Sequence, residues 1–142
     1  MLKRVVGIII LFFNLCRGNL PSCDVVRDCG AVPDGETLND VALSLCAASC
    51  SRLIFPANAA FLVASVDISN TTGLAIIFNE GSRIVATTNS SLYPIAPFYP
   101  PMGKTTCYRA VIFVRNVSNL LISGPTSAVI DGQGAVWQPG RP

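Results

Sequence analysis

Carboxylates are the side chains most suited to acid–base chemistry here, because the 142-residue chain has eight Asp and Glu residues and no histidine. Two carboxylates can serve as general acid and general base when both face one substrate. Asp34 and Asp131 could form such a pair, but each precedes a glycine in a predicted turn, where a carboxylate accepts nearby backbone N–H groups. Asp28 and Asp40 should act similarly at a turn and a helix cap. We assign no catalytic residue and expect the other acids to be solvated: Asp24, Glu36, Asp67 and Glu80.

Cysteines are the second group that could do chemistry. Five lie beyond the N-terminal segment: Cys23, Cys29, Cys46, Cys50 and Cys107. No Cys-x-x-Cys pair and no histidine occurs, so we expect disulfides and neither a metal nor another cofactor. Five is odd, so at least one thiol is left over or pairs outside this sequence, and the spacing does not choose among the possible pairings.

Three Asn-x-Ser/Thr sequons predict N-glycosylation, at Asn70, Asn89 and Asn116. They agree with the N-terminus, where Lys3 and Arg4 precede an apolar run from Val5 to Phe13. A basic start, a short apolar run and a small residue are typical of a secretory signal peptide, here residues 1–18 with cleavage near Gly18. A buried N-terminal strand or helix is the alternative. We expect a secreted, disulfide-bonded glycoprotein.

The charge of the chain changes when this segment is removed. Loss of Lys3, Arg4 and Arg17 leaves seven basic residues against eight acids, a net charge of −1. No basic cluster remains, which argues against nucleic acid as a partner. No other segment is long and apolar enough to span a bilayer, so we expect no membrane association after cleavage.

The elements that must position these residues are mostly strands. Residues 39–50 predict one short helix with Val41, Leu45 and Ala48 on its inner face. Short apolar runs separated by Gly, Asn, Ser and Pro predict strands at Arg52–Phe55, Phe61–Ile68, Leu74–Phe78, Arg83–Ala86, Ala110–Arg115, Leu120–Ser123 and Ala128–Asp131.

Two all-β folds fit this spacing, an antiparallel sandwich and a parallel β-helix. Runs such as Leu74–Phe78 are nearly continuous in apolar residues, which favours strands with little solvated face. Ile54 and Ile76 lie about one solenoid turn apart. We therefore predict the start of a right-handed parallel β-helix over 19–142, with the helix at residues 39–50 covering its first coil.

Two segments interrupt or end this pattern. Residues 89–109 break the strand pattern, and Tyr93 to Gly103 within them hold four prolines and three aromatic residues, which predicts a projecting loop. Lys104 and Arg109 flank this loop. We expect that loop to pack on the scaffold and the two cations to be solvated. Near the C-terminus, Gly132 and Gly134 predict a corner that needs positive φ or close backbone approach. Trp137 follows, and we expect it in the core rather than against a sugar.

Several of these segments resemble the polygalacturonases, the pectin hydrolases of glycoside hydrolase family 28. Residues Ile130 to Trp137 match the pattern Ile-Asp-Gly-x-Gly-x-x-Trp, and Val25 to Asn39 are similar to the family's opening motif, with Cys29 in place of an aromatic residue and Pro33 in place of glycine. Arg52 to Ala57 and the loop from Tyr93 to Tyr99 are similar to further family segments in the same order.

This resemblance implies a glycosidase that hydrolyses α-1,4-galacturonan with inversion, acting on pectin in the plant cell wall as a monomer. The family's Asn-Thr-Asp, Asp-Asp, Gly-His-Gly and Arg-Ile-Lys motifs do not occur here. We therefore expect an N-terminal part of such an enzyme, truncated before the later coils and inactive as this chain. The alternative is a non-catalytic secreted protein that binds pectin or a related cell-wall glycan.

Overall fold

The computed structural model describes residues 20–96 and 107–137. The expected signal peptide and Lys104 lie outside these residues. The described elements are β1 (Ser22–Asp24), β2 (Asp34–Leu38), α2 (Asp40–Ser49), β3 (Arg52–Phe55), β4 (Ala60–Val63), β5 (Val66–Ser69), β6 (Ala75–Phe78), β7 (Arg83–Ala86), the 3-10 helix η2 (Ser90–Leu92), β8 (Ile112–Arg115), β9 (Leu121–Ser123), β10 (Val129–Asp131) and α3 (Gly134–Trp137).

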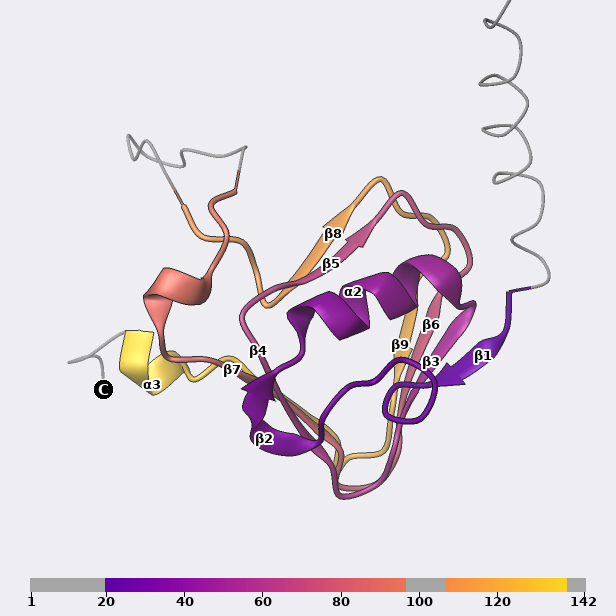
Figure 1. Ribbon diagram of the computed structural model, residues 1–142, viewed down its shortest axis with the longest axis horizontal. Helices are drawn as coiled ribbons and strands as arrows, with labels where there is room; N and C mark the ends of the chain where they lie inside the picture. The colour runs from indigo at the N-terminus through magenta and orange to yellow at the C-terminus, as the bar shows by residue number, and fades with distance from the viewer. Residues whose placement is uncertain (1–19, 97–106, 138–142) are drawn as a thin grey trace, which may run out of the picture.

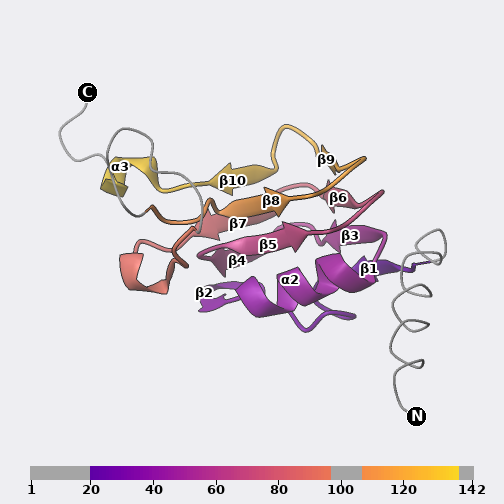
Figure 2. The same cartoon turned by 90° about the horizontal axis from the view of Figure 1, so that it is seen from above.

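The strands form three parallel sheets, ordered β1-β3-β6-β9, β10-β7-β4-β2 and β5-β8. Each strand from β3 to β7 pairs with the third strand after it, so that successive triplets lie one above another (Figure 2). Every strand pair among the described residues is parallel, and the one antiparallel contact is an isolated bridge between Ile95 and Tyr108. The all-β parallel arrangement is confirmed, and the antiparallel sandwich is excluded.

The register shows where the repeat is interrupted. Arg52 pairs with Ala75 and Ala60 with Arg83. In the next layer Ala75 pairs with Leu121. The longer separation arises because 25 residues, 87–111, lie between β7 and β8 in the chain. Described residues on the two sides of the predicted loop are joined by two backbone hydrogen bonds, from the Ala96 N–H to the Cys107 carbonyl and from the Arg109 N–H to the Pro94 carbonyl. The middle of the predicted projecting loop, residues 97–106, lies outside the described residues, and its projection stays a prediction.

Burial alternates along each inner strand. In β3, β4, β6 and β7 every second side chain is buried and its neighbours are partly exposed. The apolar side chains on the second face, such as Ile54 and Ile77, are only partly exposed, so this face has limited contact with solvent. On the inner face Phe55 stacks on Phe78 with ring centroids 4.7 Å apart and meets Phe61 edge-on at 5.2 Å. These rings connect successive layers through the core.

The predicted helix is confirmed as α2, but its inner face is not the one expected. Leu43, Cys46 and Ala47 are buried, whereas Val41 is 73% and Leu45 is 65% exposed. The segment is apolar nearly all round, so its pattern does not select a face. The selection comes from packing: α2 lies beside β5, where the Ser44 hydroxyl accepts the Asp67 N–H (Figure 1).

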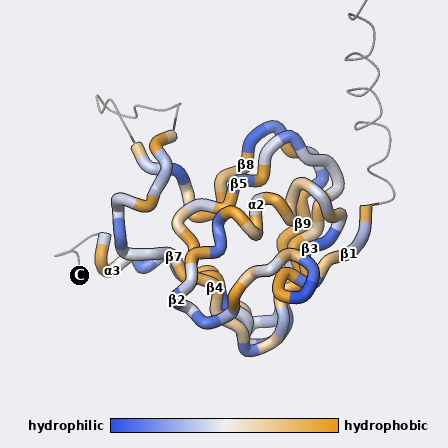
Figure 3. The backbone as a smooth tube through the Cα atoms, viewed as in Figure 1, coloured by the Kyte–Doolittle hydropathy of each residue, from blue (hydrophilic) through white to orange (hydrophobic). Residues whose placement is uncertain are grey.

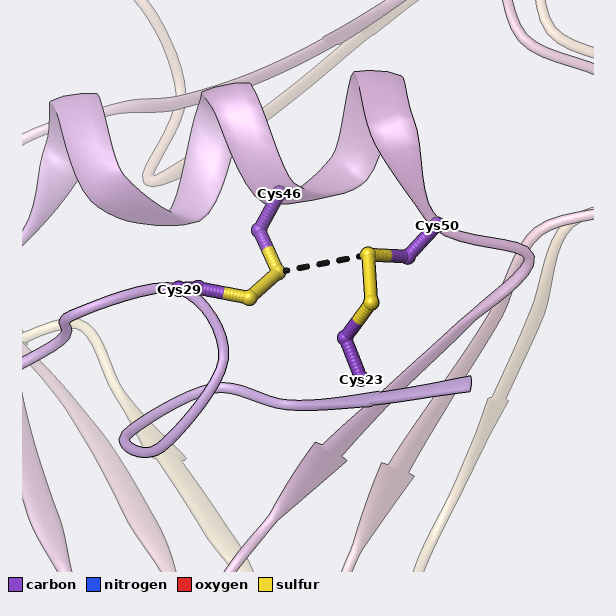
Figure 4. Close-up of side chains that lie close together, drawn as sticks. All are labelled: Cys23, Cys29, Cys46 and Cys50. Atoms are coloured by element: carbon purple, nitrogen blue, oxygen red, sulfur yellow. Dashed lines mark hydrogen bonds between the residues drawn. A yellow bond between two sulfur atoms is a disulfide. The ribbon is translucent and has the colours of Figure 1, made fainter. Parts of the chain in front are cut away.

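Two disulfides fix α2 to the N-terminal strand and loop. Cys23 pairs with Cys50, and Cys29 pairs with Cys46. Figure 4 shows both bridges under the last turns of the helix, with the Cys46 and Cys50 sulfurs 3.8 Å apart. Cys107, the fifth cysteine, lies at the base of the projecting loop.

The last layer, which includes β9 and β10, has solvent-exposed apolar side chains. Leu121 and Ile122 of β9 are 54% and 44% exposed, and Val129 and Ile130 of β10 are exposed to a similar degree. Figure 3 shows that the backbone around β3 and β9 is hydrophobic. Among the described residues no helix is both long and apolar enough to cross a membrane.

Candidate functional site

The two carboxylates that could have formed a catalytic pair lie on opposite edges of one sheet. Asp34 belongs to β2 and Asp131 to β10, with β4 and β7 between them. Three strand spacings separate these edges by roughly 14 Å. An inverting glycosidase holds its two carboxyl groups about 6.5–9.5 Å apart. The arrangement does not supply that geometry.

Each of these acids is instead bound to its own turn. Asp34 accepts the N–H groups of Glu36 and Thr37 and the Thr37 hydroxyl. The Thr37 hydroxyl and these backbone groups lower the pKa of Asp34 to about 2. Asp131 accepts the Gln133 N–H at 2.9 Å. The predicted turn roles are confirmed for both.

A third turn carboxylate, Asp28, is held by a cation. Arg27 contacts Asp28 at 2.9 Å, and Asp28 also accepts the Asp24 N–H. The hydrogen bond from Arg27 is the main reason that the pKa of Asp28 falls to about 2. Asp24 accepts the N–H groups of Val26 and Arg27, so it is engaged in the same turn rather than purely solvated.

Contrary to expectation, Asp40 does not cap α2 but binds the bend between β4 and β5. Neither Asn39 nor Asp40 caps α2 through its side chain; Asp40 accepts the N–H groups of Ala64 and Ser65, which lie between β4 and β5. Burial raises the pKa of this carboxyl group. The contact explains why the predicted strand Phe61–Ile68 is two strands: the chain bends at Ala64 and Ser65, and Asp40 takes up the N–H groups freed there.

Arg109 has a structural partner that sequence reasoning missed. Its guanidinium contacts Asp67 at 2.9 Å and lies 4.6 Å from the centre of the Phe113 ring. Asp67 also accepts the Ser69 hydroxyl. Both charged residues were expected to be solvated, and that expectation is wrong because the base of the projecting loop returns beside β5. The pair is too far apart in sequence to be recognised from spacing.

Three aromatic residues meet where the base of the predicted loop lies beside α3. Tyr93 is buried and donates its hydroxyl hydrogen to the Thr87 carbonyl at 2.8 Å. Its ring lies 5.9 Å from that of Tyr108 and 5.4 Å from that of Trp137. Tyr108 is 51% and Trp137 39% exposed, so the expected core position of Trp137 is wrong. Exposed aromatic faces can stack on sugar rings.

The corner before Trp137 also differs from expectation. Gln133 takes the positive φ, at 55°, while Gly132 and Gly134 do not. A Cβ atom at either glycine would meet nothing within 4 Å. Neither positive φ nor close approach accounts for these two glycines.

The three sequon asparagines lie at exposed turns, two of them together. Asn70 follows β5 and Asn116 follows β8, with φ of 54° and 53°. The Asn116 Nδ2 atom donates to the Asn70 Oδ1 atom at 2.9 Å. Asn89 lies elsewhere, where its Oδ1 accepts the N–H and hydroxyl of Ser91 at the start of η2.

The four paired cysteines are the one group among the described residues with metal-ligand geometry, since their sulfur atoms all lie within 4.8 Å of one another. Zinc binds thiolates. In this structure both pairs are disulfides, so none of these sulfurs is a thiolate.

No known protein family, curated protein or solved structure matches this chain.

Proposed function

We propose that this chain is the N-terminal part of a secreted, polygalacturonase-like protein of the plant cell wall, whose substrate is pectin. Its sheets would be the first coils of a right-handed parallel β-helix, with α2 covering the N-terminal end. In this proposal the acid and base that hydrolyse galacturonan belong to later coils. The 142 residues alone have no hydrolytic activity.

The observation that carries the proposal is the order of strand pairing. Each strand from β3 to β7 pairs in parallel with the third strand after it, as a chain wound with three strands per turn requires. α2 follows β1 and β2 in the place that β5 and β8 hold in later turns. A helix at this position covers the edge of β5 that does not pair with β8, which is the role of a terminal cap.

The open last layer supports the idea that further coils stack on it. β9 and β10 each have a partner on one side only, and their apolar side chains are about half exposed. The segment similar to the polygalacturonase signature, Ile130 to Trp137, begins in β10 and ends in α3. It therefore lies on the layer that the next coil would cover.

A second candidate function is binding of pectin or a related glycan without hydrolysis. The exposed rings of Tyr108 and Trp137 favour it, because aromatic faces are a common sugar platform. The carboxylates favour it too, because Asp28, Asp34 and Asp131 are engaged in local turns.

One set of measurements separates these functions. The full chain is secreted from a eukaryotic host and run through gels containing polygalacturonate or a neutral glucan, and new reducing ends are measured. The enzyme proposal expects no reducing ends, no retardation, and Asn-Thr-Asp and Gly-His-Gly motifs in the reading frame beyond Pro142. The binding function expects retardation by polygalacturonate that Trp137→Ala weakens and Val41→Ala, on the exposed face of α2, does not.

Three results would contradict these ideas. Cleavage of polygalacturonate by this chain would place the chemistry among residues that we exclude. A continuing frame without either motif would remove the enzyme proposal. Retardation unchanged in Trp137→Ala would remove the aromatic platform as the binding surface.

A further inference from the structure

The turns that hold Asn70 and Asn116 are joined to each other by several hydrogen bonds. β5 and β8 pair in register up to Ser69 and Arg115, the residues just before the two asparagines. The Asn70 N–H donates to the Arg115 carbonyl, and the Ser118 N–H donates to the Thr71 carbonyl. Thr72 and Ser118 form a parallel bridge and share a hydroxyl hydrogen bond of 3.1 Å. The two sequons are therefore stacked residue on residue.

Stacking gives the two asparagine amides different roles. Both residues have positive φ, at 54° and 53°, and their side-chain amides are in contact. Asn116 uses its nitrogen as the donor, and Asn70 uses its oxygen as the acceptor. No described residue accepts a hydrogen bond from the Asn70 nitrogen. Asn89 resembles Asn70, because both of its hydrogen bonds use Oδ1.

An N-linked glycan is attached through the side-chain nitrogen of asparagine and is bulky. At Asn70 and Asn89 it would occupy a nitrogen that has no partner among the described residues, and the existing hydrogen bonds would remain. At Asn116 it would replace a hydrogen on the nitrogen that already faces Asn70. Adjacent parallel strands are only about 4.8 Å apart. A branched oligosaccharide is wider than this spacing, so glycans on both stacked residues would compete for one space.

From this geometry we propose that Asn70 and Asn89 carry N-glycans in the secreted protein and that Asn116 remains unmodified. The inference uses only the secretory route and the atoms of the stack, so it holds whichever glycan the protein recognises. It also assigns different roles to three equivalent sequons: Asn70 and Asn89 carry glycans, whereas Asn116 serves the structure.

The test is site occupancy on the full chain secreted from a eukaryotic host. Enzymatic release of the glycans in heavy-oxygen water marks each occupied asparagine, and mass spectrometry of the peptides reads the three sites. We expect label at Asn70 and Asn89 and little at Asn116. Label at Asn116 on most secreted chains, or its absence at Asn70 or Asn89, would overturn the proposal.

Two substitutions of Asn70 test whether its hydrogen bond with Asn116 is the reason that Asn116 stays unmodified. Asn70→Asp and Asn70→Gly both remove the first sequon, and both residues tolerate positive φ better than most. Asp keeps an oxygen that accepts from Asn116, whereas Gly leaves the Asn116 nitrogen without its partner. We expect Asn116 to stay bare in Asn70→Asp and to become occupied in Asn70→Gly. Equal occupancy of Asn116 in the two variants would show that the stack is not the cause.

A third variant keeps the proposal testable if Asn70→Gly is not secreted. Ser118→Ala removes the Asn116 sequon and leaves both asparagines in place. We expect the mass of the secreted glycoprotein to match that of the wild type, apart from the lost oxygen. Loss of one glycan mass would mean that Asn116 is used, which contradicts the assignment.

Discussion

At the scale of single residues, backbone conformation decides more than chemical type. Asn58, Asn70, Asn116, Asn119 and Gln133 all have positive φ without being glycine. Asparagine is the non-glycine residue best suited to that region, so an Asn-rich turn was predictable in kind. The positive φ of Gln133 was not predictable, because glycine adopts that conformation most readily and Gln133 lies between two glycines. The stacking of the two sequons was also not predictable from the sequence, because it depends on the register between turns that lie 46 residues apart.

Gly81 and Gly132 form a matched pair for testing this point. Gly81 has φ of 66°, and a Cβ atom there would lie 2.5 Å from the Asn58 Oδ1 atom. Gly132 has neither constraint. We expect Gly81→Ala to lower the free energy of unfolding by about 1–2 kcal/mol, because an L-residue is strained in the left-handed region. Gly132→Ala should be neutral, or stabilising by up to about 1 kcal/mol, through the unfolded chain.

Urea unfolding of the two variants measures the difference. A Gly81→Ala protein as stable as the wild type would mean that the turn between β6 and β7 does not hold the conformation described.

At the scale of elements, the order and position of most strands followed from apolar runs and turn residues. β3 and β7 have the predicted bounds, and β6, β8, β9 and β10 begin a residue or two later than predicted. The predicted strand Phe61–Ile68 is two strands, β4 and β5. β1 was missed because Ser22–Asp24 is short, and β2 because Asp34–Leu38 is polar. Their pairing with β3 and β4 comes from the register of the sheet. The face of α2 was predicted wrongly for the related reason that neighbouring elements, not its own pattern, determine which side is buried.

Leu43 and Leu45 test which face of α2 is packed. Leu43 is 1% and Leu45 65% exposed, two positions apart on the same helix. Leu43→Ala should lower the free energy of unfolding by about 2–5 kcal/mol, as for other buried leucines. Leu45→Ala should change it by no more than about 0.5 kcal/mol. Denaturant midpoints compare the two directly, and equal losses would contradict the orientation of the helix.

At the scale of the whole molecule, the turn carboxylates couple stability to pH. Asp28 and Asp34 have pKa values lowered to about 2, so the folded chain binds fewer protons there than the unfolded chain does. Their contribution is present above the ordinary carboxyl pKa and is lost as pH falls through about 2. Asp40 acts in the opposite direction. Burial raises its pKa, so its contribution to stability is complete below the ordinary carboxyl pKa and is lost as pH rises through the raised value.

We therefore expect the urea midpoint to fall between pH 4 and pH 2, about the ordinary and shifted pKa values of Asp28 and Asp34. Asp34→Asn should flatten this dependence, because its amide no longer titrates while its oxygen still accepts backbone N–H groups. Asp40→Asn should leave the dependence in this range nearly unchanged and alter the midpoint above it, because the contribution of Asp40 is already complete below the ordinary carboxyl pKa. The sign of the proposed coupling would be wrong if Asp34→Asn and the wild type lost stability equally over this range.

The disulfides also give the molecule a direction of assembly. Both bridges join residues between Cys23 and Cys50, ahead of every strand from β3 onward. A chain that emerges with its N-terminus first can close both bonds while the remaining strands are still being made. Each later strand then meets a covalently fixed surface, so the search for the correct register starts from one end and proceeds along the polypeptide as it is synthesised.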